Sequence, residues 1–156
     1  MKYGEWQDIP LIVSLVGRYA RGESLLSSGV GKYQLAAKAL HRIGRGRIRE
    51  LLAVEMPSEL LARIIRGLSD KEFKTLPVEQ ISVLLDSDSD RVRKITALKC
   101  VHSFPKKRLI QTLQDYVTGD KHRYYNVVYW LDLGLSAPRE IALRSATKVM
   151  AREWSE

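Results

Sequence analysis

The chain has 156 residues, which is enough for one domain with its own core, because domains typically contain roughly 100–200 residues. With 45% hydrophobic and 28% charged residues, it is typical of a globular protein and not of a disordered one. The 26 Lys and Arg against 18 Asp and Glu give a formal charge of +8, which favours acidic partners such as nucleic acid, an anionic surface or an acidic protein. The single cysteine, Cys100, excludes an internal disulfide and lies in an apolar run, so we expect a buried, reduced thiol.

No apolar stretch reaches the roughly 20 residues that a membrane-spanning helix needs. The longest apolar run near the start, residues 9–16, is interrupted by Pro10 and Ser14. Glu5 and Asp8 stand where a secretory signal would carry a basic region. We therefore expect a cytoplasmic protein that does not associate with a membrane.

Apolar residues recur at helical spacing along the first half of the chain. Asp8 and Pro10 open a predicted helix that ends near Arg21, and a Ser/Gly-rich turn over residues 27–31 follows it. Ser69 and Glu72 match a capping box that begins a short helical piece. Further helices are predicted over residues 32–43, 47–54 and 60–68.

The second half of the chain has the same helical spacing, and proline or aspartate residues mark the starts of its helices more clearly. Pro77 opens a predicted helix over residues 78–85, and Asp90 is predicted to cap a helix over residues 91–103. Pro105 starts another over residues 106–117, and two more are predicted over 121–133 and 137–154. Sustained strand alternation is absent from the sequence, so the prediction is an all-α protein of eight to ten helices joined by short turns.

A stretch of the chain occurs twice, at residues 27–44 and 88–105, with an offset of 61 residues. Self-similarity at such a spacing is typical of helical repeats. We expect the matched alanines to lie where helices approach closely. The matched histidines are predicted to be partly buried structural residues, because no other metal ligands accompany them. The matching pairs are Ala36 with Ala97, Lys38 with Lys99, Leu40 with Val101 and His41 with His102.

The second copy carries a recognisable pattern. Leu84 and Leu85 end a helix, an acidic turn follows over residues 86–90, and the next helix opens with Val92-Arg93. This pattern resembles the HEAT-type helical repeat, most clearly over residues 76–138 and more weakly over 24–68. The first copy departs from it, because glycines 29 and 31 stand where the second copy has Asp90 and Val92.

The resemblance implies antiparallel helix pairs stacked as a short α-solenoid, and an irregular helical bundle is the alternative. It also implies one domain over residues 1–156, with an irregular half at 1–76 and a more regular half at 77–156. A faint third copy places Arg123 at the position of Arg93, and Lys32 occupies the same place in the first copy. Such cations could form a row for an anionic ligand. They could also form a ladder in which each arginine pairs with a turn aspartate, and the resemblance favours this for Arg93 and Arg123.

The best candidate site is a basic stretch between Glu23 and Glu50, which contains six Lys or Arg and no acidic residue. Arginine forks bind phosphate or carboxylate oxygens, and Gly44 and Gly46 would let backbone amides approach an anion. The alternative is a solvated charged turn. A second cluster lies in the first turn of a helix, where positive charge opposes the helix dipole. The candidate residues are Lys32, Lys38, Arg42, Arg45, Arg47 and Arg49, with Lys106, Lys107 and Arg108 in the second cluster.

Three aromatic residues, Tyr125, Tyr129 and Trp130, are candidate partner contacts, because rings of this kind serve interfaces or stack on exposed bases. Packing in the core is the alternative for some of them.

The predicted function is a non-enzymatic helical-repeat binding module or adaptor that docks a protein partner. The alternative is a basic nucleic-acid-binding protein. A remote one is a HEAT-like DNA glycosylase, a class that uses Trp, Asp and Arg around a base; Trp130, Asp132 and Arg123 are such residues but match no motif. No nucleophile–base set is recognisable, and we expect no cofactor, metal or small-molecule substrate.

Overall fold

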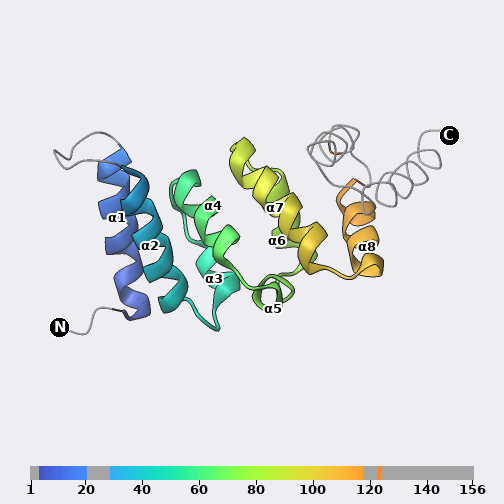
Figure 1. The fold of residues 1–156 in the computed structure, drawn as a ribbon, viewed down its shortest axis with the longest axis horizontal. Coiled ribbons are helices and arrows are strands. Elements are labelled where there is room, and N and C mark those ends of the chain that lie inside the picture. Colours follow the sequence, from blue (N-terminus) through green and yellow to red (C-terminus); the bar gives the residue numbers. More distant parts are fainter. Residues whose placement is uncertain (1–3, 21–28, 118–122, 124–156) are drawn as a thin grey trace. The chain divides into compact units, whose positions relative to one another are not determined.

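The computed structural model describes residues 4–20, 29–117 and 123, which form two compact units, Met1–Leu76 and Pro77–Glu156 (Figure 1). The described residues contain eight α-helices, one short 3₁₀ helix and no strand, which confirms the all-α prediction for this part of the chain. None of these helices has the length and apolar character required to cross a membrane. The helices predicted over 121–133 and 137–154 lie outside the described residues.

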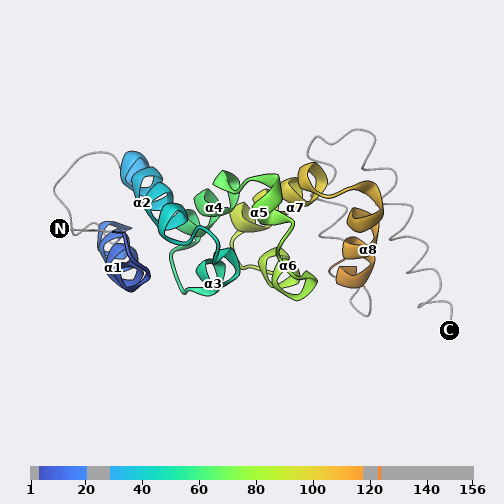
Figure 2. The same ribbon diagram turned by 90° about the horizontal axis from the view of Figure 1, so that it is seen from below.

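The first unit is built around one central helix, α2. This helix packs against α1 on one side and α4 on the other, and Figures 1 and 2 show the three in that order. Leu40 of α2 is fully buried between them, together with Ile9 and Val16 of α1 and Ile64 of α4. The elements of this unit are η1 (Trp6–Asp8), α1 (Ile9–Ala20), α2 (Gly29–Ile43), α3 (Ile48–Ala53), α4 (Ser58–Gly67) and α5 (Asp70–Phe73).

The start of α2 differs from the prediction. The sequence predicted a turn over residues 27–31, whereas the helix begins at Gly29, so that Gly31 is helical. Glycine has a low helix propensity, and a local pattern therefore stops at it. The packing of α2 on α1 and α4 supplies stabilisation that this local pattern does not contain.

The second unit contains α6 (Val78–Leu85), α7 (Asp90–Ser103) and α8 (Lys106–Val117), and α6 packs against both of the others. The bounds of α6 and α8 are those predicted. The cap of α7 is not: the hydroxyl of Ser89, and not the carboxylate of Asp90, accepts the hydrogen bond from the Val92 amide, at 3.4 Å. Asp90 is instead the first helical residue, and its carboxylate pairs with Arg93 and Lys94.

The 61-residue register of the sequence repeat does not describe the buried faces of α2 and α7. Leu35 is 70% exposed, whereas its match, Thr96, is fully buried. The same offset pairs buried Ala37 with exposed Leu98. The 61-residue match of letters therefore does not extend to burial in these two helices, because burial depends on which helices pack around a residue.

The residues singled out from the repeat show the same difference between letters and burial. Ala36 and Ala97 are only half-buried, and the buried positions are their neighbours Ala37 and Thr96. The predicted partial burial is confirmed for His41. It is wrong for His102, which is exposed on α7.

Candidate functional site

The exposed residues of α2 lie along one side of the helix. Gly31, Gln34, Leu35, Lys38 and Arg42 are exposed. With 3.6 residues per turn, these positions fall within an arc of about 100°, on the side opposite the buried core residues of the helix. Exposed Arg45 follows in the turn after α2. We call Leu35, Lys38, Arg42 and Arg45 the α2 basic face.

The turn after α2 depends on two glycines with different roles. Gly46 has a φ of 85°, which favours glycine. A Cβ at Gly44 would lie 2.7 Å from Leu51 Cδ2, so this glycine allows α2 and α3 to approach closely. The Gly44 amide donates to Leu40 O and the Arg47 amide donates to Gly44 O, both at 2.8 Å. The prediction that the glycines present backbone amides to an anion is therefore wrong for these two amides.

Arg47 and Arg49 are held by the protein's own groups. The Arg47 guanidinium lies 3.9 Å from the centre of the Trp6 ring and forms an ion pair with Glu50. The hydrogen bond from Arg47 lowers the pKa of Glu50. Arg49 Nε donates to the backbone oxygen of Thr75 at 2.9 Å. These two arginines connect α3 to η1 and to the segment after α5, and they do not belong to the α2 basic face.

Lys32, the remaining member of the predicted basic stretch, is half-buried near the start of α2. Its partial burial separates it from Lys38, which lies on the exposed side of the same helix. The structure therefore brings three of the six predicted cations, Lys38, Arg42 and Arg45, together on the α2 basic face.

His41 joins the end of α2 to α5. Its Nε2 lies 2.9 Å from Glu72 Oε1, and Glu72 Oε2 accepts hydrogen bonds from the amide and the hydroxyl of Ser69, at 2.8 and 2.9 Å. Partial burial by itself raises the pKa of Glu72. The hydrogen bonds from the Ser69 amide, His41 and the Ser69 hydroxyl outweigh this effect and hold the pKa below its ordinary value. The capping box predicted at Ser69 and Glu72 is confirmed.

We expect Glu72→Gln to lower the free energy of unfolding at pH 7 by about 1 kcal/mol, because it weakens the cap of α5 and the bond to His41. The folded-state pKa of Glu72 lies below the ordinary value of 4.5. Its contribution to stability is therefore fully present above about pH 4.5 and is lost as the pH falls through the lowered pKa. Urea denaturation at pH 7 and at a series of pH values below 4.5 measures both effects.

The matched control for this substitution is Glu55→Gln, at an exposed glutamate of the same unit. The control should unfold like the wild type at pH 7. Below pH 4.5, the Glu72→Gln variant should lose less stability than the wild type, because the carboxylate responsible for that loss is absent. If the wild type and the Glu72→Gln variant lost the same amount of stability below pH 4.5, the role of Glu72 would be contradicted.

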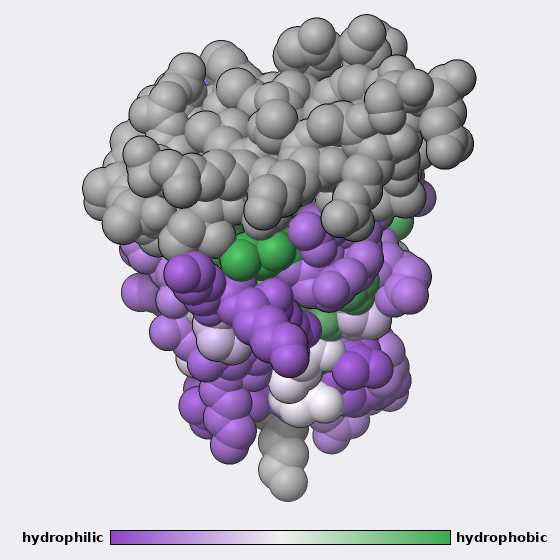
Figure 3. All heavy atoms as spheres, turned by 90° about the vertical axis from the view of Figure 1, so that its right-hand side faces the viewer, coloured by the Kyte–Doolittle hydropathy of each residue, from purple (hydrophilic) through white to green (hydrophobic). Residues whose placement is uncertain are grey.

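The second basic cluster is also divided by the structure. Lys106 and Lys107 are exposed at the start of α8, whereas Arg108 is half-buried and its guanidinium lies 4.2 Å from the centre of the Phe104 ring. Figure 3 shows the side of the molecule on which α8 lies, where the described residues are mainly hydrophilic. Two lysines of this cluster therefore remain as surface cations of the second unit.

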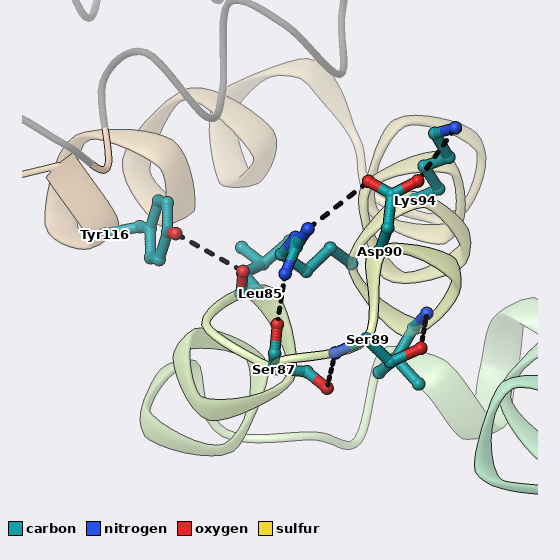
Figure 4. Close-up of polar contacts among 8 residues, drawn as sticks. Leu85, Ser87, Ser89, Asp90, Lys94 and Tyr116 are labelled. Carbon is teal, nitrogen blue, oxygen red and sulfur yellow. Dashed lines mark hydrogen bonds and ion pairs between the residues drawn. The ribbon is translucent and has the colours of Figure 1, made fainter. Parts of the chain in front are cut away.

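Two aspartates of the acidic segment between α6 and α7, Asp86 and Asp90, pair with basic side chains of their own unit. Arg93 donates to the backbone oxygen of Ser87 at 2.6 Å and to Asp90 Oδ1 at 3.4 Å (Figure 4). Lys94 Nζ lies 3.0 Å from Asp90 Oδ2. The predicted pairing of Arg93 with a turn aspartate is confirmed.

Arg123 pairs with another aspartate of the same acidic turn, Asp86. Its Nη2 lies 2.6 Å from Asp86 Oδ2, and its Nη1 donates to the backbone oxygen of Tyr116 at 3.2 Å. The Tyr116 hydroxyl donates to Asp86 Oδ1 at 2.8 Å. Both arginines therefore pair with aspartates of the segment that joins α6 to α7, Arg93 within its own helix and Arg123 with a residue 37 positions earlier.

The remaining predictions concern the aromatic residues near the end of the chain, metal binding and the single cysteine. Tyr125, Tyr129, Trp130 and Asp132 lie outside the described residues. Within the described ranges, no group of three or more His, Cys, Asp or Glu could hold a metal ion. Cys100 is buried, as predicted, and burial raises its pKa to about 12, so that its thiol stays protonated at neutral pH.

Leu35 is the residue that the sequence interpretation missed. Its side chain is 70% exposed, and it lies three residues before Lys38 at the start of the α2 basic face. The spacing of positions 35, 38, 42 and 45 predicts a common helix face, and this signal was present in the sequence. Comparisons of the chain with protein-family models, curated proteins and solved structures found no match.

Proposed function

We propose that the chain is a HEAT-like helical-repeat binding module that docks a protein partner on the α2 basic face. The observation that carries the proposal is the exposed Leu35 side chain, 70% accessible, in line with three exposed cations. Lys38, Arg42 and Arg45 form no ion pair with acidic side chains in the described part of the chain. The face therefore offers one apolar contact and three positive charges to a complementary surface.

The composition of the face favours a protein over a nucleic acid. A bulky apolar side chain beside cations suits the centre of a protein interface, where burial of apolar groups contributes much of the affinity. Proteins that bind duplex DNA firmly neutralise about 6–10 phosphates, whereas this face presents three cations. Nucleic acid remains the second candidate; it would use the same three cations in the first unit or, as a separate contact, Lys106 and Lys107 in the second unit.

The repeat architecture in the proposal is supported by contacts of the second unit. α6 is followed by an acidic turn and packs on α7, and α8 packs on α6 in turn. Arg123 reaches back to Asp86 in the turn before α7, and a ladder of stacked helix pairs would contain contacts of this type. Each helix pair in such an array hides its apolar face against a neighbour and leaves its outer faces for partners.

Selection from a displayed library of random 20-residue peptides, with the full chain as bait, tests the proposed function. We expect selected peptides to be acidic with at least one large apolar residue. Their affinity should fall at least 100-fold when Lys38, Arg42 and Arg45 are all changed to Glu, because three attractive contacts become repulsive. Fluorescence anisotropy of purified peptides measures the affinity.

The matched control changes Arg18, Arg66 and Lys71 to Glu, which alters the net charge equally at exposed positions on other helices of the same unit. This control should bind the selected peptides within about threefold of the wild type. Parallel titrations use a 20-base-pair duplex and a 30-nucleotide single strand at 50 and 200 mM salt. Submicromolar DNA binding with a log–log salt slope of about −3 or steeper, lost in the triple variant of the face, would replace protein docking by nucleic-acid binding.

A further inference from the structure

We infer that the segment captured on the α2 basic face is an α-helix of the partner, with a one-sided row of carboxylates next to a large apolar residue. This inference rests on the proposed function and names the partner segment that fits the same face. It follows from the spacing of the face, from its chemistry and from the absence of a backbone-pairing surface in the described residues.

Leu35, Lys38 and Arg42 of the α2 basic face form a row along the helix, with intervals of three and four positions. At 1.5 Å rise per residue, Leu35 and Arg42 stand about 10 Å apart along the helix, and Lys38 lies between them. The same intervals place side chains on one face of a second helix, so a partner helix alongside α2 matches these three residues at once, and Arg45 adds a positive charge in the turn that follows.

An extended partner segment fits this surface less well. Pairing of an added strand requires a sheet edge, and residues 4–20 and 29–117 contain no strand. Recognition of a polyproline segment requires a groove lined by aromatic rings, and none of the exposed residues on α2 is aromatic. A partner can therefore bind the face only through side-chain contacts. A regular helix presents side chains at the required spacing, and its backbone hydrogen bonds are already satisfied within the helix.

The chemistry of the row specifies the complementary side chains. Lysine and arginine are donors without acceptors, so carboxylates satisfy Lys38, Arg42 and Arg45. The stretch between Glu23 and Glu50 supplies no acidic residue that could compete from the same helix. Leu35 lies at the end of the row, where a large apolar side chain of the partner would be removed from water together with it.

Three fluorescein-labelled peptides of 15 residues, all alanine-based and of identical composition, test the inference with the full chain. The first has glutamates at positions 2, 5 and 9 and leucine at position 12, which lie on one helix face. The second has the same residues distributed around the helix. The first two peptides carry a proline at one end. The third keeps the one-sided order of glutamates and leucine but has this proline at its centre and an alanine at the end, so that its helix is interrupted.

Fluorescence anisotropy should show that the one-sided peptide binds at least tenfold more tightly than either of the others. Leu35→Ser should weaken its binding about tenfold. Val83→Ser is the matched control, because Val83 is also 70% exposed but belongs to the second unit. This control should leave the affinity unchanged.

The contrary outcomes separate this inference from the proposed function. Equal binding of the scattered or the interrupted peptide would overturn the helical row. So would failure of all three peptides while library-selected peptides still bind through Lys38, Arg42 and Arg45. In each of these cases docking on the face stands. Equal binding of the one-sided peptide to the wild type and to the triple glutamate variant would overturn the inference and the docking face together.

Discussion

Tyr116→Ala should destabilise the second unit by about 3–5 kcal/mol, the loss typical of removing a large buried ring. Tyr116 of α8 is fully buried, and its hydroxyl donates to Asp86 Oδ1 at 2.8 Å and lies 3.5 Å from Leu85 O at the end of α6. The Arg123 guanidinium lies 5.0 Å from the centre of its ring. Alanine leaves a cavity between α6 and α8 and removes the donor to Asp86.

The thiol of Cys100 offers a readout specific to the second unit. It is the only cysteine of the chain, it is 1% exposed, and burial raises its pKa to about 12. A thiol reagent reaches it through opening of the structure, so the labelling rate follows the opening equilibrium. Tyr116→Ala should accelerate labelling about 10²- to 10⁴-fold under native conditions, with about tenfold for each 1.4 kcal/mol.

The conservative control is Tyr116→Phe, which keeps the ring volume and removes the hydroxyl. We expect it to cost about 1–2 kcal/mol, because Asp86 loses one donor but retains Arg123. Labelling of Cys100 at the wild-type rate in Tyr116→Ala would show that α8 does not hold α6 in place.

Gly44→Ala should destabilise the first unit by about 1–3 kcal/mol, as overpacking in a close contact does. The added Cβ would lie 2.7 Å from Leu51 Cδ2, 3.1 Å from Leu51 Cβ and 3.2 Å from Leu40 O. The Leu51 methyl can rotate away, but its Cβ and the backbone oxygen can move only with α3 or α2. Urea denaturation followed by far-UV circular dichroism measures the change.

Gly31→Ala, inside α2, is the matched control in the same unit and has the opposite expected sign. Nothing lies within 4 Å of a Cβ at Gly31, and the residue is helical. Alanine there should stabilise the protein by about 0.5–1 kcal/mol, because it has the higher helix propensity and restricts the unfolded chain. A destabilising Gly31→Ala would favour the turn predicted from the sequence over the observed start of α2. A stabilising Gly44→Ala would contradict the close approach of α2 to α3.

Much of the fold could be predicted because local signals bound its helices on both sides. Pro77 and Pro105 precede α6 and α8, and the structure begins these helices at the next residue, Val78 and Lys106. The start of α2 lacked such a signal, because glycine marks a turn locally and is overridden by packing. The cap of α7 was assigned to Asp90 although Ser89 is equally suited to an N-cap, and the choice depended on Arg93 and Lys94 taking the aspartate.

The candidate site followed the same division. The stretch without acidic residues between Glu23 and Glu50 indicated six cations as candidate site residues. The sequence could not distinguish the exposed cations from those that pair with other groups of the protein. The Arg47 guanidinium contacts the ring of Trp6, 41 positions earlier in the chain. Arg49 donates a hydrogen bond to the backbone oxygen of Thr75, 26 positions later. Contacts at such separations arise only when the chain has folded.

The sequence by itself determined the helical class, the positions of most helices, the buried thiol and the basic character of the first unit. These properties depend on side-chain type and on spacing within a few residues, which is the range over which helical periodicity and capping act. Only the tertiary structure decided which residues of the two matched stretches are buried, the structural roles of Gly44 and Arg47, and the exposure of Leu35 on the same helix as Lys38 and Arg42. Burial and pairing depend on which helices meet, and that is a property of the packed chain rather than of any local pattern.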